Sequence, residues 1–155
     1  MESLAGLKTM AAAAYADSSF LVSLYLRDDN HARACTFMTK YAPALAFLPL
    51  HRVEVRNSLR LTETKGLITS EERRRIFKQL AQDMRDGFLK HVVVAWSDIF
   101  RRADELSEKY RVKHGQRAID LLHVAAALES GIGTFLSFDR RQCGLAEAAG
   151  LQVKP

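Results

Sequence analysis

Short apolar runs alternate along the chain with longer segments that have helical periodicity. The apolar runs have the length and the flanking turn residues of strands. Between them, apolar residues recur every three or four positions, as in helices that bury one face. The expected strands are 12–17, 44–49, 91–96, 133–138 and, as a possible fifth, 151–153; the expected helices are about 18–26, 30–40, 50–64, 69–85, 97–111, 117–130 and 143–150.

This alternation predicts an α/β fold with a parallel sheet of four to five strands and helices on both faces, in three layers. Crossovers between parallel strands are right-handed, so the carboxyl ends of all strands lie at one edge of the sheet. Ligands in such folds bind outside that edge. Polar residues near these strand ends are therefore the first candidates for a functional site.

Four acidic residues fall at such positions. Asp17 ends the first expected strand, and Asp139 follows the fourth. Glu54 lies about one turn into the helix after the second strand. Asp120 lies in the first turn of an apolar helix, where unpaired N–H groups and the helix dipole favour an anion. We expect the four carboxylates to converge at one edge of the sheet.

Clustered carboxylates stay ionised together only when a cation compensates their charge. A donor set made only of oxygen favours Mg²⁺ or Mn²⁺, which polarises phosphoryl oxygen and activates water for hydrolysis. A net charge of +5 also suits a polyanionic, phosphodiester substrate.

Taken singly, three of the acids have ordinary structural explanations. Asp17 could cap a helix, Asp139 could open a turn, and Glu54 could lie on a polar surface. Asp120 is harder to explain in this way because its neighbours are apolar. Their shared position at one edge of the sheet favours a site.

The composition indicates one soluble globular domain. The chain has 155 residues, of which 48% are hydrophobic and 26% charged, and no apolar run is long enough to span a membrane. The two cysteines are far apart and lack a CxxC partner, which favours a reducing, cytoplasmic setting over a disulfide or zinc framework. We expect residues 1–10 to be a disordered or mis-started extension, rather than a signal peptide, and 11–155 to form a single domain.

Four segments carry a family resemblance: "YADSSFLVSLYL", "LPLHRVEVRNSL", "HGQRAIDLLHVAAAL" and "GTFLSFDRRQCGLAEAAGL". In their order and spacing they resemble the PIN-domain proteins, specifically the VapC-type toxin ribonucleases of type II toxin–antitoxin systems. The last two segments are the most specific. The resemblance extends over roughly residues 13–153.

The resemblance implies a Rossmann-like α/β/α sandwich and a metal-dependent endoribonuclease that hydrolyses RNA with Mg²⁺ or Mn²⁺. It implies that Asp17, Glu54, Asp120 and Asp139 form the catalytic, metal-binding site. Ser137 stands where the family often has threonine or serine, and would contact metal-bound water or orient an acid. A small antitoxin protein and a homodimer are implied in the same way.

Basic residues divide into two groups. Those near the acids are candidates for holding RNA phosphates, although each could instead pair with a carboxylate. Those on the 50–64 helix recur every four residues and point away from Glu54; a solvated face is the first interpretation, and an antitoxin or distal RNA contact the second. The first group is Arg117, Arg140 and Arg141, and the second is Arg52, Arg56 and Arg60.

His123 follows Asp120 by three residues and therefore lies near the same helix face. We interpret it as a packed, hydrogen-bonded histidine rather than a proton shuttle.

Alternative functions are a PIN-type nuclease of RNA processing and a non-catalytic binding module of the same fold. A haloacid-dehalogenase phosphatase would need a D-x-D pair, but Ser18 and Ser19 follow Asp17.

Overall fold

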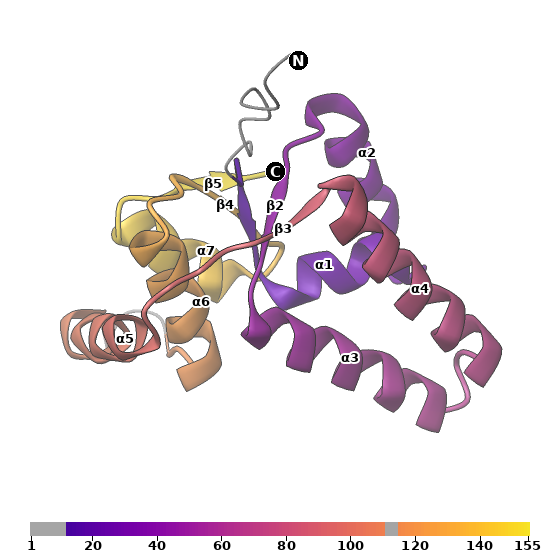
Figure 1. Ribbon diagram of the computed structural model, residues 1–155. Helices are drawn as coiled ribbons and strands as arrows, with labels where there is room; N and C mark the ends of the chain where they lie inside the picture. Colours follow the sequence, from indigo (N-terminus) through magenta and orange to yellow (C-terminus); the bar gives the residue numbers. More distant parts are fainter. Residues whose placement is uncertain (1–11, 111–114) are drawn as a thin grey trace, which may run out of the picture.

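The computed structural model describes residues 12–110 and 115–155 (Figure 1). The expected extension at residues 1–10 and the last residue of the expected 97–111 helix lie outside these ranges. The strands are β1 (Tyr15–Ala16), β2 (Leu45–Phe47), β3 (Leu89–His91), β4 (Thr134–Leu136) and β5 (Gln152–Lys154). The helices are α1 (Ser18–Tyr25), α2 (His31–Tyr41), α3 (Pro49–Thr64), α4 (Ser70–Asp86), α5 (Trp96–Tyr110), α6 (Ala118–Glu129) and α7 (Arg140–Ala148).

All strand pairs are parallel. Strand β4 lies between β1 and β5, and β2 pairs with β3. A single bridge between Ala14 and Leu45 joins the two groups of strands. The backbone N–H of Ala46 donates to the carbonyl of Ala14 at 3.0 Å beside this bridge. The resulting order is β3-β2-β1-β4-β5, with β1 in the centre.

Helices cover both faces of this sheet, as expected. In Figure 1, α1, α2, α3 and α4 lie on one side of the strands, and α5, α6 and α7 lie on the other. Alternate strand residues contribute to two separate cores. Tyr15 and Phe135 pack with α5, α6 and α7, whereas Ala16 and Leu136 pack with the helices of the other layer. The predicted α/β/α sandwich is therefore confirmed.

The third strand was predicted wrongly at 91–96. The strand is Leu89–His91, and Trp96 begins α5 instead of ending a strand. The partner strand β2 stops at Phe47, because Pro49 begins α3 and has no N–H to donate to a ladder. The β-branched run after His91 therefore has no strand beside it.

Local signals at the helix ends were more reliable. The T-x-x-E pattern at residues 69–72, where a helix is expected to begin, forms a capping box at the start of α4: the backbone N–H of Thr69 donates to Glu72 at 2.6 Å, and that of Glu72 donates to the Thr69 hydroxyl at 3.1 Å. Asn30 occupies the N-cap position of α2 but makes no capping bond with its side chain. Within the described residues, no helix has the length and apolarity that a membrane span requires.

A buried histidine fastens the start of α3 to the central strand. The Nε2–H of His51 donates to the carbonyl of Ala16 at 2.8 Å, while its Nδ1 accepts from the backbone N–H of Leu48 at 3.0 Å. Both ring nitrogens are thus satisfied in one neutral tautomer, and the residue is fully buried. Burial, followed by the nearby charge of His123, lowers the pKa of His51 from 6.5 to about 3.

We therefore expect His51 to make the fold sensitive to acid. Below pH 6.5 the unfolded chain protonates this histidine while the folded chain keeps it neutral, so stability falls as the pH drops toward about 3. The slope attributable to this group approaches about 1.4 kcal/mol per pH unit. Denaturant melts of the parent and His51→Gln between neutral and acid pH measure it, because glutamine keeps a donor and an acceptor but does not titrate. Parallel pH profiles for the two proteins would contradict the assignment.

Candidate active site

Asp17 lies directly after β1 and caps α1. Its Oδ1 accepts hydrogen bonds from the backbone N–H of Phe20 at 2.7 Å and from the Ser19 hydroxyl at 2.9 Å. Its Oδ2 accepts from the Ser137 hydroxyl. Burial raises the pKa of Asp17 above its usual value, because the residue is only 2% exposed and the bonds from Ser137 and Phe20 offset only part of the desolvation.

Ser137 connects Asp17 with Asp139. Its hydroxyl donates to Asp17 and accepts the backbone N–H of Asp139 at 3.0 Å. Asp139 in turn caps α7, where its Oδ1 accepts the backbone N–H groups of Arg141 at 2.8 Å and Gln142 at 3.1 Å. Both aspartates are therefore helix caps as well as members of one hydrogen-bonded group.

Glu54 is held from two directions. Its Oε1 accepts from the Ser18 hydroxyl at 2.7 Å and from the Nε2–H of His123. Burial alone would raise the pKa of Glu54, but the hydrogen bonds and charge contributed by His123, with the bond from Ser18, leave it below the usual value. The carboxylate is thus kept ionised although its side chain is only 29% exposed.

The ring of His123 is fixed from its other side by Tyr15. The Tyr15 hydroxyl lies 2.7 Å from Nδ1, and both residues are buried. Burial, together with the charges of Glu54 and Asp17, raises the pKa of Tyr15 well above its usual value, so the phenol stays protonated and donates. The expected packed, hydrogen-bonded histidine is confirmed. Its nitrogen Nε2 is thereby aimed at Glu54.

Asp120 forms a two-point ion pair with Arg117 at the start of α6. The Nε of Arg117 lies 3.1 Å from Oδ2, and its Nη2 lies 3.3 Å from Oδ1. The aspartate side chain is 8% exposed and the arginine side chain 72% exposed. The hydrogen bond with Asp120 and its charge, followed by the weaker effects of the charges of Asp139 and Glu54, raise the pKa of Arg117.

Chains of hydrogen bonds connect the predicted acids at the carboxyl edge of the sheet: Ser137 links Asp17 with Asp139, and Ser18, next to Asp17, donates to Glu54. Gln142 connects Asp139 with Asp120. Its backbone N–H donates to the Asp139 carboxylate, and its side-chain amide lies 3.5 Å from the carbonyl of Asp120. Two further predicted phosphate ligands, Arg140 and Arg141, are exposed in the first turn of α7.

Residues 14–148 match the PIN domain. The chain belongs to the PIN-domain family. The matched segment contains all four acids, Ser137 and the three arginines proposed to hold phosphates. No curated protein matches the chain.

Solved structures share the fold of this PIN domain at low sequence identity. FitAcB from Neisseria gonorrhoeae has a TM-score of 0.64 at 13% identity, over 92% of this chain and 96% of that one. VapBC2 from Rickettsia felis, solved with a DNA fragment from its promoter, has a TM-score of 0.61 at 12% identity, over 91% of this chain and 96% of that one. VapC20 from Mycobacterium tuberculosis, a toxin that cleaves the sarcin–ricin loop, has a TM-score of 0.59 at 18% identity, over 92% of this chain and 99% of that one.

The four acids offer only oxygen ligands, which are the ligands that a hard divalent cation such as Mg²⁺ prefers. In the observed arrangement, protein donors engage these oxygens instead. Within the described residues, no three His, Cys, Asp or Glu side chains are arranged to hold a metal ion. A cation would require Arg117 to leave Asp120, and the high exposure of Arg117 makes that movement inexpensive.

The source of charge compensation differs from the sequence-based expectation. From the sequence, a bound cation is expected to compensate the four acids. The pKa of Asp17 is raised, with burial as the largest cause, and the pKa of Glu54 is lowered. Within the described residues, Asp120 pairs with Arg117, and Glu54 accepts a hydrogen bond from His123.

Sequence reasoning missed the roles of Tyr15 and Ser18. Tyr15 looked like an ordinary strand residue, and Ser18 like the first residue of a helix. Their hydrogen bonds reach His123 and Glu54 across 108 and 36 positions of the sequence, respectively. The available signal was that both flank Asp17 and are polar in an otherwise apolar stretch.

Asp17→Asn should leave the metal-free protein at least as stable as the parent. The raised pKa means that the folded state holds a buried charge at a cost at neutral pH, and asparagine removes this charge while still accepting the Phe20 N–H. Thermal melts with chelator present should show an equal or higher Tm. A large drop in Tm would show that the charge itself holds the fold together.

His123→Leu should destabilise the fold by about 2 kcal/mol or more, because it leaves buried polar groups of Tyr15 and Glu54 without their partner. His123→Gln keeps an N–H donor and should therefore lose less stability than His123→Leu. Urea melts of the three proteins measure the difference. Equal losses for both variants would show that packing, and not the hydrogen bonds, is the main contribution of His123.

Proposed function

We propose that this PIN domain is a metal-dependent endoribonuclease and the toxin component of a toxin–antitoxin pair. The observation that supports the proposal is that hydrogen-bonded neighbours connect acids from distant parts of the chain at the carboxyl edge of a PIN-domain sheet. The charges of three of these acids raise the pKa of Arg117. A basic chain with an acidic site suits a phosphodiester substrate.

In this proposal Asp17, Glu54, Asp120 and Asp139 hold Mg²⁺ or Mn²⁺, which when bound polarises the phosphoryl oxygen and activates water. The supporting side chains keep the carboxylates in place. Ser137 fixes Asp17 relative to Asp139, and His123 orients Glu54. Such orientation matters because catalysis depends on preorganised groups.

Arg117 has a further role in this proposal. Its side chain is the exposed member of the pair with Asp120. If Asp120 held the cation, the guanidinium of Arg117 would be available to bind an RNA phosphate beside it. Arg140 and Arg141 are exposed beside Asp139 and can hold adjacent phosphates.

The proposed partners are a small antitoxin protein and a second copy of the chain. Support for the antitoxin comes from the fold shared with VapBC2 of Rickettsia felis, which was solved bound to a DNA fragment from its promoter. A small protein encoded directly upstream that co-purifies with this chain and suppresses cleavage would support the toxin role. Cleavage without such a partner would favour a PIN nuclease of RNA processing.

Purified parent protein should cut RNA with Mg²⁺ or Mn²⁺ and lose this activity with chelator. Asp17→Asn should remain folded and cut more slowly by orders of magnitude, as expected when a charge that stabilises the transition state is removed. Asp104→Asn, on the exposed face of α5, is the matched control and should cut like the parent.

The assay uses single-stranded and structured RNA, with a melting curve for each variant. Unchanged cleavage by folded Asp17→Asn would refute the role given to this residue. No cleavage of any RNA by the parent with either metal would favour the non-catalytic binding module.

A further inference from the structure

Three arginines gather around one phenylalanine where α3 and α4 face each other. The guanidinium carbons of Arg56, Arg73 and Arg60 lie 4.5, 5.2 and 5.6 Å from the ring centroid of Phe77. Arg52 lies one helical turn before Arg56. Partial burial and the charges of Arg52, Arg60 and Arg73 lower the pKa of Arg56, which indicates how closely the four are grouped. We call these five residues the arginine cluster.

The positive charge of the arginine cluster is largely uncompensated. Arg73 forms an ion pair with Glu63 of α3. In the part of the chain that the structure describes, no acidic side chain pairs with Arg52, Arg56 or Arg60. Like charges held this close repel one another, and a bound polyanion would relieve that repulsion.

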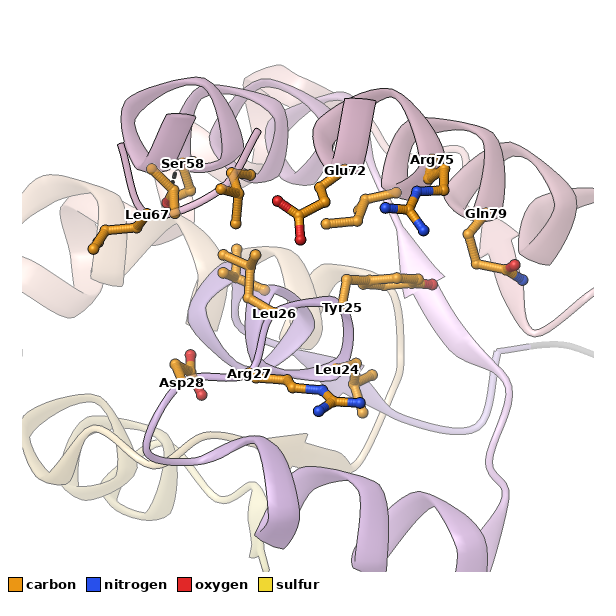
Figure 2. A pocket seen from close by; sticks show the side chains of 14 residues that line it. Leu24, Tyr25, Leu26, Arg27, Asp28, Ser58, Leu67, Glu72, Arg75 and Gln79 are labelled. Atoms are coloured by element: carbon orange, nitrogen blue, oxygen red, sulfur yellow. Dashed lines mark hydrogen bonds between the residues drawn. The ribbon is translucent and has the colours of Figure 1, made fainter. Parts of the chain in front are cut away.

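The cluster does not resemble a site for a protein partner. Such sites depend on apolar or aromatic anchors that enter pockets, and the ring of Phe77 is already covered by guanidinium groups. A groove lined by apolar and charged side chains lies on another face of the same helix pair, between it and α1, and there Tyr25 and Leu26 offer apolar surface (Figure 2). Phosphate groups need no apolar anchor, and arginine binds them through two parallel hydrogen bonds.

We propose that the arginine cluster binds the phosphate backbone of RNA at a distance from the acids. This inference rests on the proposed function and extends it from the cleavage site to a second contact with the same substrate. Glu54 and Arg56 lie about 200° apart around α3, a helix about 10–12 Å across with its side chains. An RNA strand that reaches both must therefore cross the exposed face of α3, where Val53 is 67% exposed. Only an RNA of several nucleotides can do so.

Binding can be measured without cleavage. In an Asp17→Asn background with chelator, the affinity for a long single-stranded RNA is followed by fluorescence anisotropy over a range of salt concentrations. Adding Arg56→Gln and Arg60→Gln should weaken binding about tenfold and reduce the slope of log affinity against log salt by about 1.4, or about 0.7 for each lost phosphate contact. Adding Arg56→Lys and Arg60→Lys instead should retain most of the slope, because the charge remains.

The matched control removes the same charge elsewhere. Arg85→Gln with Arg101→Gln changes two exposed helical arginines outside the cluster and the acidic site, and should leave the slope unchanged. Melting curves check that every variant is folded. In the metal-loaded protein with an intact Asp17, the cluster variant should show a higher KM on long RNA, and unchanged turnover of a dinucleotide.

The outcomes are distinct. An unchanged salt slope in the folded glutamine variant overturns the proposal, as does an equal loss in the control. A variant that binds RNA normally but no longer binds an acidic protein also overturns it, in favour of a protein partner. If the parent cuts short RNA but the cluster variant binds long RNA like the parent, the proposed function stands and this inference fails. If RNA binding depends on the cluster but no RNA is cut, this inference stands and the proposed function fails.

Discussion

A carboxylate removed from water must find donors or a counter-charge, and this constraint organises the edge of the sheet. Asp17 is nearly inaccessible, and three donors surround it. Glu54 and Asp120 each have a basic partner, His123 and Arg117 respectively. Arg117 caps α6 and His123 lies within it, so this one helix and its cap supply both partners.

Most of the fold could be predicted because its signals are local. Capping residues such as Thr69, and the alternation of apolar runs with amphipathic helices, each act over a few positions. The third strand could not be located in this way. Its run of β-branched residues has the right propensity, but a strand also needs a partner, and Pro49 ends the partner too early. Whether a run of β-branched residues forms a strand therefore depends on a neighbouring strand that can pair with it.

The candidate site, too, could be predicted only in part. The positions of the acids follow from the topology, because all strands end at one edge. The partners of the acids do not follow from it. Arg117 was expected to hold phosphate or to pair with a carboxylate, and the structure shows the pair with Asp120. The link from Tyr15 through His123 depends on side-chain directions across the buried interface between strand and helix, which no periodicity encodes.

The central position of β1 has a consequence for synthesis of the chain. This strand is translated before its ladder partner β4, which lies about 120 residues later in the sequence and ends at Leu136. A growing chain thus exposes Asp17 and Glu54 long before Asp120 and Asp139 have been translated. Domains assemble as units, and here the central ladder closes only after β4 has emerged. A ribosome making this PIN domain would therefore carry an incomplete acidic site until β4 and Asp139 have been translated.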